Sequence, residues 1–121
     1  MRWFDIEDFD CPCCGQNDMD KDFLWKLDFA RTLADVPFVV TSGFRCPKHN
    51  RSKKVGGSPT SSHLKGLAAD IAVQSDYARF RIIWGLITAG FKRFGVGDGF
   101  IHIDADPDKN QERAFTYYKR K

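Results

Sequence analysis

Residues 62–73 read Ser62-His63-Leu64-Lys65-Gly66-Leu67-Ala68-Ala69-Asp70-Ile71-Ala72-Val73, and they join a polar segment to a run of small and β-branched residues. The apolar second half of this stretch predicts a short strand. His63 and Asp70 are seven residues apart, a spacing that would put both on one face of a helix. Gly66 and the β-branched end of the run argue against a helix. We therefore expect a loop to carry His63 and the following strand to carry Asp70.

Two other segments have the periodicity of helices. Apolar residues recur at helical spacing from Lys21 to Leu33, and Pro37 prevents the helix from continuing. A second helix is expected from Asp76 to Ala89, with Gly90 as its C-terminal cap. The apolar residues of this second helix that share one face are Phe80, Ile83, Trp84 and Ile87.

The remaining strands are expected to be short. Residues 38–41 are apolar and β-branched, which predicts a buried strand. Residues 94–96 and 100–103 predict two strands joined by the tight turn Gly97-Asp98-Gly99. Alternation of aromatic residues within 111–121 predicts an edge strand.

Length and composition indicate one domain that covers residues 1–121. The chain has 121 residues, of which 42% are hydrophobic and 14% aromatic, enough to bury a core. No apolar run approaches the length of a membrane span. The acidic start, Met1 to Asp8, lacks the apolar region of a secretory signal peptide. We therefore expect synthesis in the cytoplasm and no membrane partner.

The net charge of +3 is concentrated in two short basic segments, residues 48–54 and 119–121. Such patches are weak evidence for nucleic-acid binding, and we expect no nucleic-acid partner. Solvated surface charge is the simplest interpretation, although a basic rim also suits an anionic polymer such as a bacterial wall.

His63, Asp70 and His102 form a candidate metal shell, and they include two of the three histidines in the chain. Two imidazoles and one carboxylate suit Zn²⁺ with a fourth position open to water, which is the donor set of hydrolytic zinc sites. Asp104 lies two residues beyond His102, so it could orient a ligand imidazole. Taken singly, His102 could equally be a satisfied core residue and Asp70 a partner in a salt bridge.

The combined pattern resembles the zinc D-Ala-D-Ala carboxypeptidase-like (M15) peptidases, notably their small phage and prophage members. The resemblance is carried by Ser62-x-His63, Gly66-x-Ala68-x-Asp70 and His102-Ile103-Asp104. The upstream segments Ser42-Gly43-Phe44-Arg45-Cys46-Pro47-x-His49-Asn50 and Val55-Gly56-Gly57 fit the same family. The resemblance implies an α+β domain with a central antiparallel sheet, here flanked by two main helices. It also implies cleavage of peptidoglycan stem peptides or cross-links, as a carboxypeptidase, an endopeptidase or an endolysin.

Carried over residue by residue, the resemblance implies that His63, Asp70 and His102 are the zinc ligands. Arg45 matches a basic residue that pairs with a substrate carboxylate, a task suited to a guanidinium that stays charged and binds carboxylates through two hydrogen bonds. Ser62 would form hydrogen bonds near the metal or the substrate, although a turn-forming serine fits this position equally well.

The general base departs from the family pattern. Members of the family usually place an acid or a histidine two or three residues before the last zinc ligand, where this chain has Phe100 and Gly99. Asp98 is the nearest acid, and a turn at residues 97–99 would have to fold it inward to reach a water shared with the metal. Asp98 is therefore the first candidate for the base, and Asp104 is the second.

Four cysteines, Cys11, Cys13, Cys14 and Cys46, leave several states open. They could form two disulfides or one structural zinc site. The C-x-C-C spacing is not that of a standard zinc knuckle, and without a signal peptide the reduced state is the default. We expect free thiols or one bridge from Cys46 to the triplet, with a second zinc site as the alternative.

The leading functional hypothesis is thus a monomeric zinc peptidase that acts at the bacterial cell wall on a peptidoglycan peptide. Because Gly99 and Phe100 cannot act as a base, two other classes stay open. One is a domain that keeps the fold and the zinc but only binds the wall. The other is a structural component of a virion.

Overall fold

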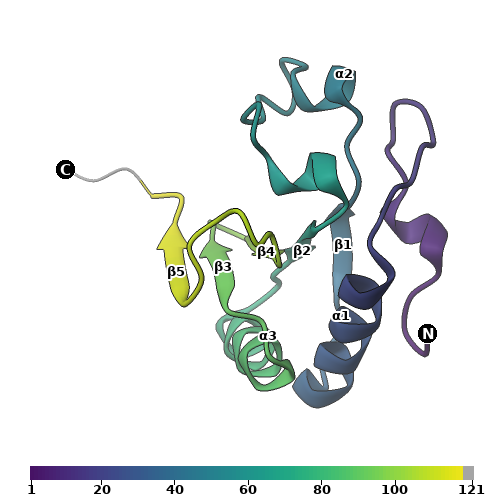
Figure 1. The fold of residues 1–121 in the computed structure, drawn as a ribbon. Helices are drawn as coiled ribbons and strands as arrows, with labels where there is room; N and C mark the ends of the chain where they lie inside the picture. The colour runs from purple at the N-terminus through teal and green to yellow at the C-terminus, as the bar shows by residue number, and fades with distance from the viewer. Residues whose placement is uncertain (119–121) are drawn as a thin grey trace.

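A five-stranded sheet forms the centre of the computed structural model, which describes residues 1–118 (Figure 1). Its strands follow the order β1-β2-β4-β3-β5. Pairing is antiparallel except between β3 and β5, which run parallel, so the sheet is mixed at one edge. The strand bounds are Val39–Ser42 (β1), Ala68–Ala72 (β2), Arg93–Val96 (β3), Phe100–Asp104 (β4) and Arg113–Thr116 (β5).

The α+β class, the antiparallel centre and the edge strand within 111–121 are therefore confirmed. The predicted edge strand at 111–121 exists as Arg113–Thr116, but it pairs parallel to β3. A long connection after β4 turns the chain around before β5 begins, and this reversal sets the strand direction. Residues 119–121, which include the basic end of the chain, lie outside the described residues.

Helices α1 (Lys21–Ala34) and α3 (Asp76–Ala89) pack on one face of the sheet (Figure 1). The Asp20 carboxylate caps α1 by accepting a hydrogen bond from Phe23 N at 2.9 Å. The Ser75 hydroxyl caps α3 in the same way, from Ala78 N at 3.1 Å, and Gly90 ends that helix at φ 104°. The predicted bounds of α3 are confirmed, and α1 is one residue longer than predicted.

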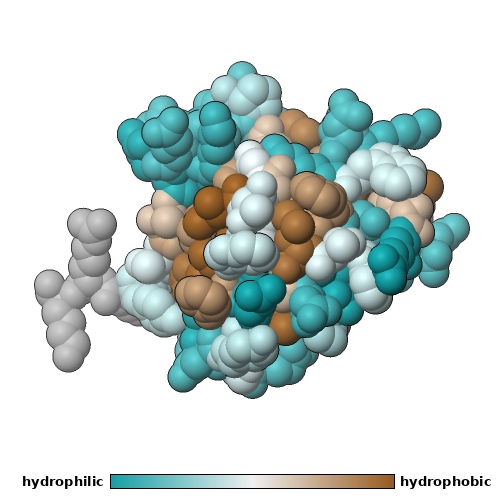
Figure 2. Space-filling view, turned by 90° about the horizontal axis from the view of Figure 1, so that it is seen from below, coloured by the Kyte–Doolittle hydropathy of each residue, from teal (hydrophilic) through white to brown (hydrophobic). Residues whose placement is uncertain are grey.

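The face of α3 that packs against the core differs from the face singled out by its large apolar residues. The structure buries Ala78, Ile82, Gly85 and Leu86, whereas Phe80, Trp84 and Ile87 are 63%, 41% and 53% exposed. Small residues decide the contact, because a Cβ on Gly85 would lie 2.7 Å from the Ala30 carbonyl oxygen of α1. The large side chains gather instead on the outer surface, where Figure 2 shows a hydrophobic patch over α1 and α3.

Three short helical turns complete the fold: η1 (Ile6–Phe9), α2 (Pro47–Asn50) and η2 (Ser62–Lys65). Both α2 and η2 lie beyond the ends of β1 and β2 (Figure 1). In the described part of the chain, every helix is too short or too polar to cross a membrane.

Alternation along the central strands separates the core from a polar surface. Ile71 and Ile101 are fully buried in the hydrophobic core together with Ala69 and Ile103. Since successive side chains of a strand point to opposite faces, residues 70, 102 and 104 must face away from the helices. The fold therefore places its candidate ligands on the face opposite the core.

Candidate metal centre

The register of β2 against β4 brings Asp70 and His102 together. The two residues are direct partners across the antiparallel pair, so their side chains leave the same face of the sheet side by side. His63 joins them from η2, the turn that precedes β2. Gly66 ends η2 in the left-handed region at φ 69°, and a Cβ at this position would overlap the Asp18 carbonyl. Glycine thus lets the chain pass from His63 into the strand that carries Asp70.

The three side chains present one donor atom each to a common point. Asp70 Oδ1 lies 3.3 Å from His63 Nε2 and 3.0 Å from His102 Nδ1. All three donor atoms lie within 4.8 Å of one another. A tetrahedral zinc site with ligand distances of about 2.0–2.1 Å has edges of roughly 3.3 Å. The two separations that involve Asp70 are therefore close to those of a zinc site, and the third lies within 4.8 Å.

The second nitrogen of each imidazole is bonded to the protein. His63 Nδ1 lies 2.8 Å from the Gly43 carbonyl oxygen, to which it donates a hydrogen bond as the Nδ1–H tautomer. His102 Nε2 likewise donates to Asp104 Oδ2 at 2.7 Å. These acceptors fix the tautomers that leave His63 Nε2 and His102 Nδ1 with free lone pairs aimed at the centre. The residues present therefore fit a zinc ion.

Charge around the centre favours an ionised carboxylate. Burial disfavours the charged form of Asp70, but hydrogen bonds that the His102 and His63 rings donate when they are protonated outweigh it and hold the pKa of Asp70 well below its usual range. Burial likewise opposes protonation of His102, but hydrogen bonds to Asp104 and Asp70 raise the pKa of His102. Without metal, a proton on His102 thus sits between two carboxylates.

Asp104 is held between His102 and Arg93. The carboxylate is 1% exposed and accepts a second hydrogen bond from Arg93 Nε at 3.2 Å. Arg93 is anchored in turn by Nη1, which donates to the Asn110 carbonyl at 3.1 Å. Asp104 therefore contacts the ligand ring, as its position two residues after His102 suggested.

Arg45 lies beside Asp70 and is positioned by three acceptors. Its Nε donates to Ser42 Oγ at 3.0 Å, and its two terminal nitrogens donate to Asn50 Oδ1 at 3.4 Å and to Asp70 Oδ2 at 3.3 Å. A guanidinium has five N–H donors, so two remain for a ligand. The structure thus brings Arg45 to the candidate metal shell.

Ser62 is buried and takes part in a structural contact. Its hydroxyl donates to Asp106 Oδ2 at 2.9 Å, and Asp106 is fully buried. Lys65 Nζ donates to the other oxygen of Asp106 at 3.0 Å. Asp106 therefore ties η2, and with it His63, to the segment after β4.

A cleft of about 510 Å³ opens over the cluster. Its basic residues are Arg45, Arg93 and Lys109, and its aromatic wall includes Tyr117. Burial, followed by the charges of Asp70 and Asp104, raises the pKa of Tyr117 to about 12, so its phenol stays protonated. The other described lining residues are Val55, Gly56, Gly57, Ser58, Ser61, Ser62, His63, Asp70, Phe100, His102, Asp104 and Phe115.

Asp98 is exposed in the turn between β3 and β4, and it is not among the described residues that line this cleft. The turn is closed by a hydrogen bond from Gly97 N to the Phe100 carbonyl at 2.9 Å. The Phe100 ring fills the space beside Gly97, which leaves no room for a larger residue. The inward fold that would bring Asp98 to the cluster is therefore not observed.

Sequence reasoning missed the supporting residues of the site. Arg93 and Tyr117 lie outside the motifs that carry the ligands, and Gly43 and Asp106 lie in or beside them without a role that the motifs indicate. Hydrogen bonds identify Gly43, Arg93 and Asp106 in the structure, and the lining of the cleft identifies Tyr117. The alternating pattern within 111–121 is the one available signal, since it predicts a strand that carries aromatic residues.

An α+β domain with two imidazoles and a carboxylate converging beneath a basic cleft defines a candidate metallohydrolase. The family model described as Peptidase M15 matches residues 5–104. The chain therefore belongs to the Peptidase M15 family, whose members are in general zinc-dependent, and the predicted membership is confirmed. All seven candidate site residues lie within the matched range. No curated protein matches the chain.

Proposed function

We propose that this protein is a zinc metallopeptidase that hydrolyses peptide bonds in bacterial peptidoglycan. The proposal rests on one observation: His63, Asp70 and His102 direct free donor atoms to one point while the protein holds the other nitrogen of each imidazole. A zinc ion at that point would polarise a carbonyl and lower the pKa of a bound water.

The residues around the cluster suit an anionic peptide. Arg45 retains two donors for a carboxylate and lies next to Asp70, so it would place a chain terminus beside the reacting bond. Arg93 and Lys109 add positive charge to the cleft. Tyr117 keeps its proton, and its hydroxyl is suited to donate to the oxygen on which negative charge develops.

The position of Arg45 favours cleavage next to a free carboxylate. This is the carboxypeptidase reaction on D-Ala-D-Ala ends, with endopeptidase cleavage of cross-links as the other outcome. The family pattern further suggests a phage or prophage source, an endolysin role and action of a monomer at the cell wall. We include these as parts of the same proposal.

Asp104 has a positioning role in this proposal. Asp70 and Asp104 supply the carboxylates among the described residues of the cleft. Asp104 already accepts a hydrogen bond from His102 Nε2, and Asp70 is itself one of the three candidate ligands. Because Asp98 does not line the cleft, its candidacy as the general base requires movement of the 97–99 turn.

A second candidate function follows from that same position. Without a base in reach, the domain could hold zinc and bind wall peptides without cutting them, as a wall-binding module or a virion component. Gly99 and Phe100, which stand where the family places its base, are the observation that favours this alternative.

The deciding experiment is incubation of the purified protein with peptidoglycan, followed by mass analysis of the soluble fragments. The proposal predicts release of D-alanine or of shortened stem peptides, abolished by a chelator and by His63→Ala. Binding to the wall without any released fragment would support the non-catalytic alternative and contradict the proposed activity.

A further inference from the structure

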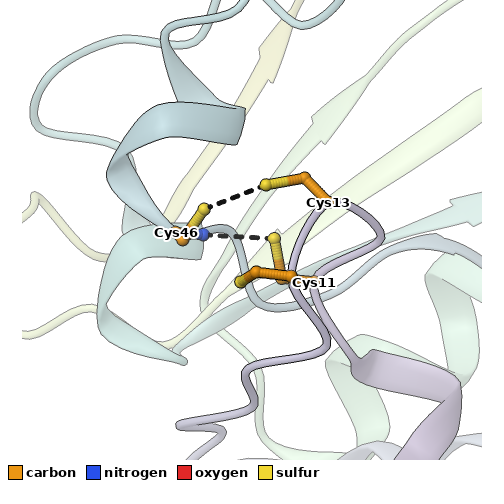
Figure 3. A group of neighbouring side chains, drawn as sticks. Cys11, Cys13 and Cys46 are labelled. Carbon is orange, nitrogen blue, oxygen red and sulfur yellow. Dashed lines mark hydrogen bonds between the residues drawn. The ribbon is translucent and has the colours of Figure 1, made fainter.

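A second cluster of metal-binding side chains lies outside the cleft. Cys11, Cys13 and Cys14 belong to one turn near the N-terminus, and Cys46 precedes α2. Figure 3 shows Cys13 and Cys11 facing Cys46 from the N-terminal segment. The four sulfur atoms all lie within 4.8 Å of one another, and the Cys13 and Cys46 sulfurs are 3.4 Å apart. The folded chain has thus gathered all its cysteines at one point.

The arrangement suits a metal ion better than a disulfide. All four cysteines are free, and the 3.4 Å separation of Cys13 and Cys46 is well beyond an S–S bond of about 2.05 Å. One bridge would also leave two further thiols in the same cluster. A tetrahedral zinc site with Zn–S distances of about 2.3 Å has edges of roughly 3.8 Å. Four sulfurs within 4.8 Å of one another, with one pair at 3.4 Å, can reach that geometry through small side-chain rotations.

Backbone N–H groups point at two of the sulfurs. Cys46 N donates to Cys11 Sγ, and His49 N donates to Cys46 Sγ, both at 3.4 Å. Such donors offset the negative charge of a thiolate, which is the form that binds metals. The backbone therefore supplies a hydrogen-bond donor to the sulfur of each buried member of the cluster.

The turn that carries three of the sulfurs is closed by its own backbone. Gly15 N donates to the Cys11 carbonyl at 2.7 Å, and Cys11 N donates to the Gln16 carbonyl at 2.9 Å. Gly15 adopts φ 75°, which lets the chain reverse directly after the cysteines. Although the C-x-C-C spacing is unusual, this turn directs the thiols of Cys11, Cys13 and Cys14 toward one another.

We propose that Cys11, Cys13, Cys14 and Cys46 bind a second zinc ion in a closed structural site. Four thiolates would fill the coordination sphere, so this ion would hold no water and take no part in hydrolysis. The four thiols would release their protons to solvent as the metal binds. The inference stands on its own geometry and does not depend on the proposed peptidase activity.

The cysteine site would fix the loop that supports the candidate metal centre. Cys46 directly follows Arg45, and the Gly43 carbonyl accepts the hydrogen bond of His63. The N-terminal segment already contacts this loop, because Phe44 N donates to the Phe9 carbonyl at 2.9 Å. A Cβ on Gly43 would lie 2.6 Å from Phe9 Cα, so the two segments pack closely. A cross-link through zinc would hold them in this arrangement.

The test is the zinc content per chain of protein kept reduced throughout, measured by mass spectrometry of the metal. We expect two zinc ions in the wild type, one in the double variant Cys13→Ser/Cys14→Ser and one in the matched variant His63→Ala/His102→Ala. Cys13 and Cys14 are both exposed, so the cysteine variant should retain its fold. If the cysteine variant loses a zinc ion and the histidine variant loses none, the cysteine site is supported. The same result contradicts the proposed function, because the histidine site would then hold no zinc.

Conversely, one zinc in the wild type that is lost only with the histidines would overturn the cysteine site and leave the proposed function intact. A wild type with two zinc ions that are both retained in the cysteine variant would overturn it as well. If the cysteine variant does not fold, X-ray absorption of the histidine variant decides the question. Four sulfur neighbours at about 2.3 Å are expected, and nitrogen or oxygen neighbours would contradict the inference.

Discussion

At the scale of the residue, the candidate centre depends on what each imidazole does with its second nitrogen. A histidine can donate from one nitrogen and bind metal through the other only if an acceptor fixes the tautomer. Gly43 supplies that acceptor for His63, and Asp104 supplies it for His102. The two acceptors differ in kind, because one is a backbone carbonyl and the other a buried carboxylate held by Arg93.

This difference makes Asp104 testable by substitution. We expect Asp104→Asn to weaken zinc binding at the histidine site about 10–100-fold, because the amide is a poorer acceptor for the ring N–H. Asp98→Asn is the matched control, since Asp98 is exposed and outside the cleft. Titration against a competing chelator, in the Cys13→Ser/Cys14→Ser background, measures both. Equal affinities in the two variants would show that Asp104 does not support the ligand.

Zinc affinity should also depend on pH through His102. Its raised pKa means that the metal-free protein binds a proton where the metal must bind. As pH falls through that raised pKa, we expect zinc affinity to drop by about tenfold per unit of pH for the one competing proton. A chelator titration across this range measures the slope. An affinity independent of pH would contradict the assignment of His102 Nδ1 as a donor.

The stability of the metal-free protein should depend on His102 in the opposite direction, since the contribution of this residue falls as pH rises. The raised pKa of His102 stabilises the fold below about pH 6.5, its unfolded value, and this contribution is lost as pH rises through the folded pKa. The lowered pKa of Asp70 stabilises the fold above about pH 3.9 and is lost as pH falls through the folded value. The combined contribution of His102 and Asp70 to the thermal unfolding temperature of the metal-free protein should therefore be largest between about pH 3.9 and about pH 6.5. Added zinc should move the optimum to higher pH.

At the scale of the element, η2 is the short turn that carries His63 to the candidate centre. It is a single turn, and Ser62 and Lys65 secure it to Asp106. Asp106 is fully buried, so its carboxylate depends on these donors.

Ser62→Ala should therefore destabilise the fold by about 1–3 kcal/mol, because it removes a donor from a buried carboxylate. Denaturant unfolding of the metal-free protein measures the change. Asp108→Ala is the control, since Asp108 contacts Lys65 from an exposed position and its loss should have no measurable effect. An unchanged midpoint for Ser62→Ala would show that Asp106 does not rely on the serine.

The contact of α1 with α3 is set by a glycine. Gly85→Ala places a Cβ 2.7 Å from the Ala30 carbonyl oxygen and 2.8 Å from Ala34 Cβ, and neither can move far within a helix. We expect a loss of about 1–3 kcal/mol in unfolding free energy, despite the better helix propensity of alanine. Thr88→Ala, at an exposed position of the same helix, should be neutral or slightly stabilising in the same assay. Stabilisation by Gly85→Ala would contradict the close packing of α1 and α3.

At the scale of the whole molecule, the local sequence pattern predicted the helices and strands, but it did not determine which of them pack or pair with one another. The C-terminal bound of α3 followed from Gly90, which is a local signal. The buried face of α3 could not be predicted in this way, because the helix carries apolar residues on all its faces. Packing selects the side that includes Ala78 and Gly85. The parallel pairing of β5 likewise depends on a long connection that has no periodicity of its own.

The candidate site shows the same division. His63, Asp70 and His102 were identifiable because their motifs are short and specific, and the structure brings all three together. Asp98 was chosen by distance along the chain, and the hairpin turn leaves it outside the cleft. Arg93 and Tyr117 approach the centre only through the sheet order, which the sequence pattern does not determine.

The most direct test of the central claim is anomalous diffraction at the zinc edge from crystals of the zinc-loaded protein. We predict a peak about 2.0–2.2 Å from His63 Nε2, His102 Nδ1 and the Asp70 carboxylate, with its remaining side open to the cleft. A map with no anomalous peak between these three side chains would contradict the account.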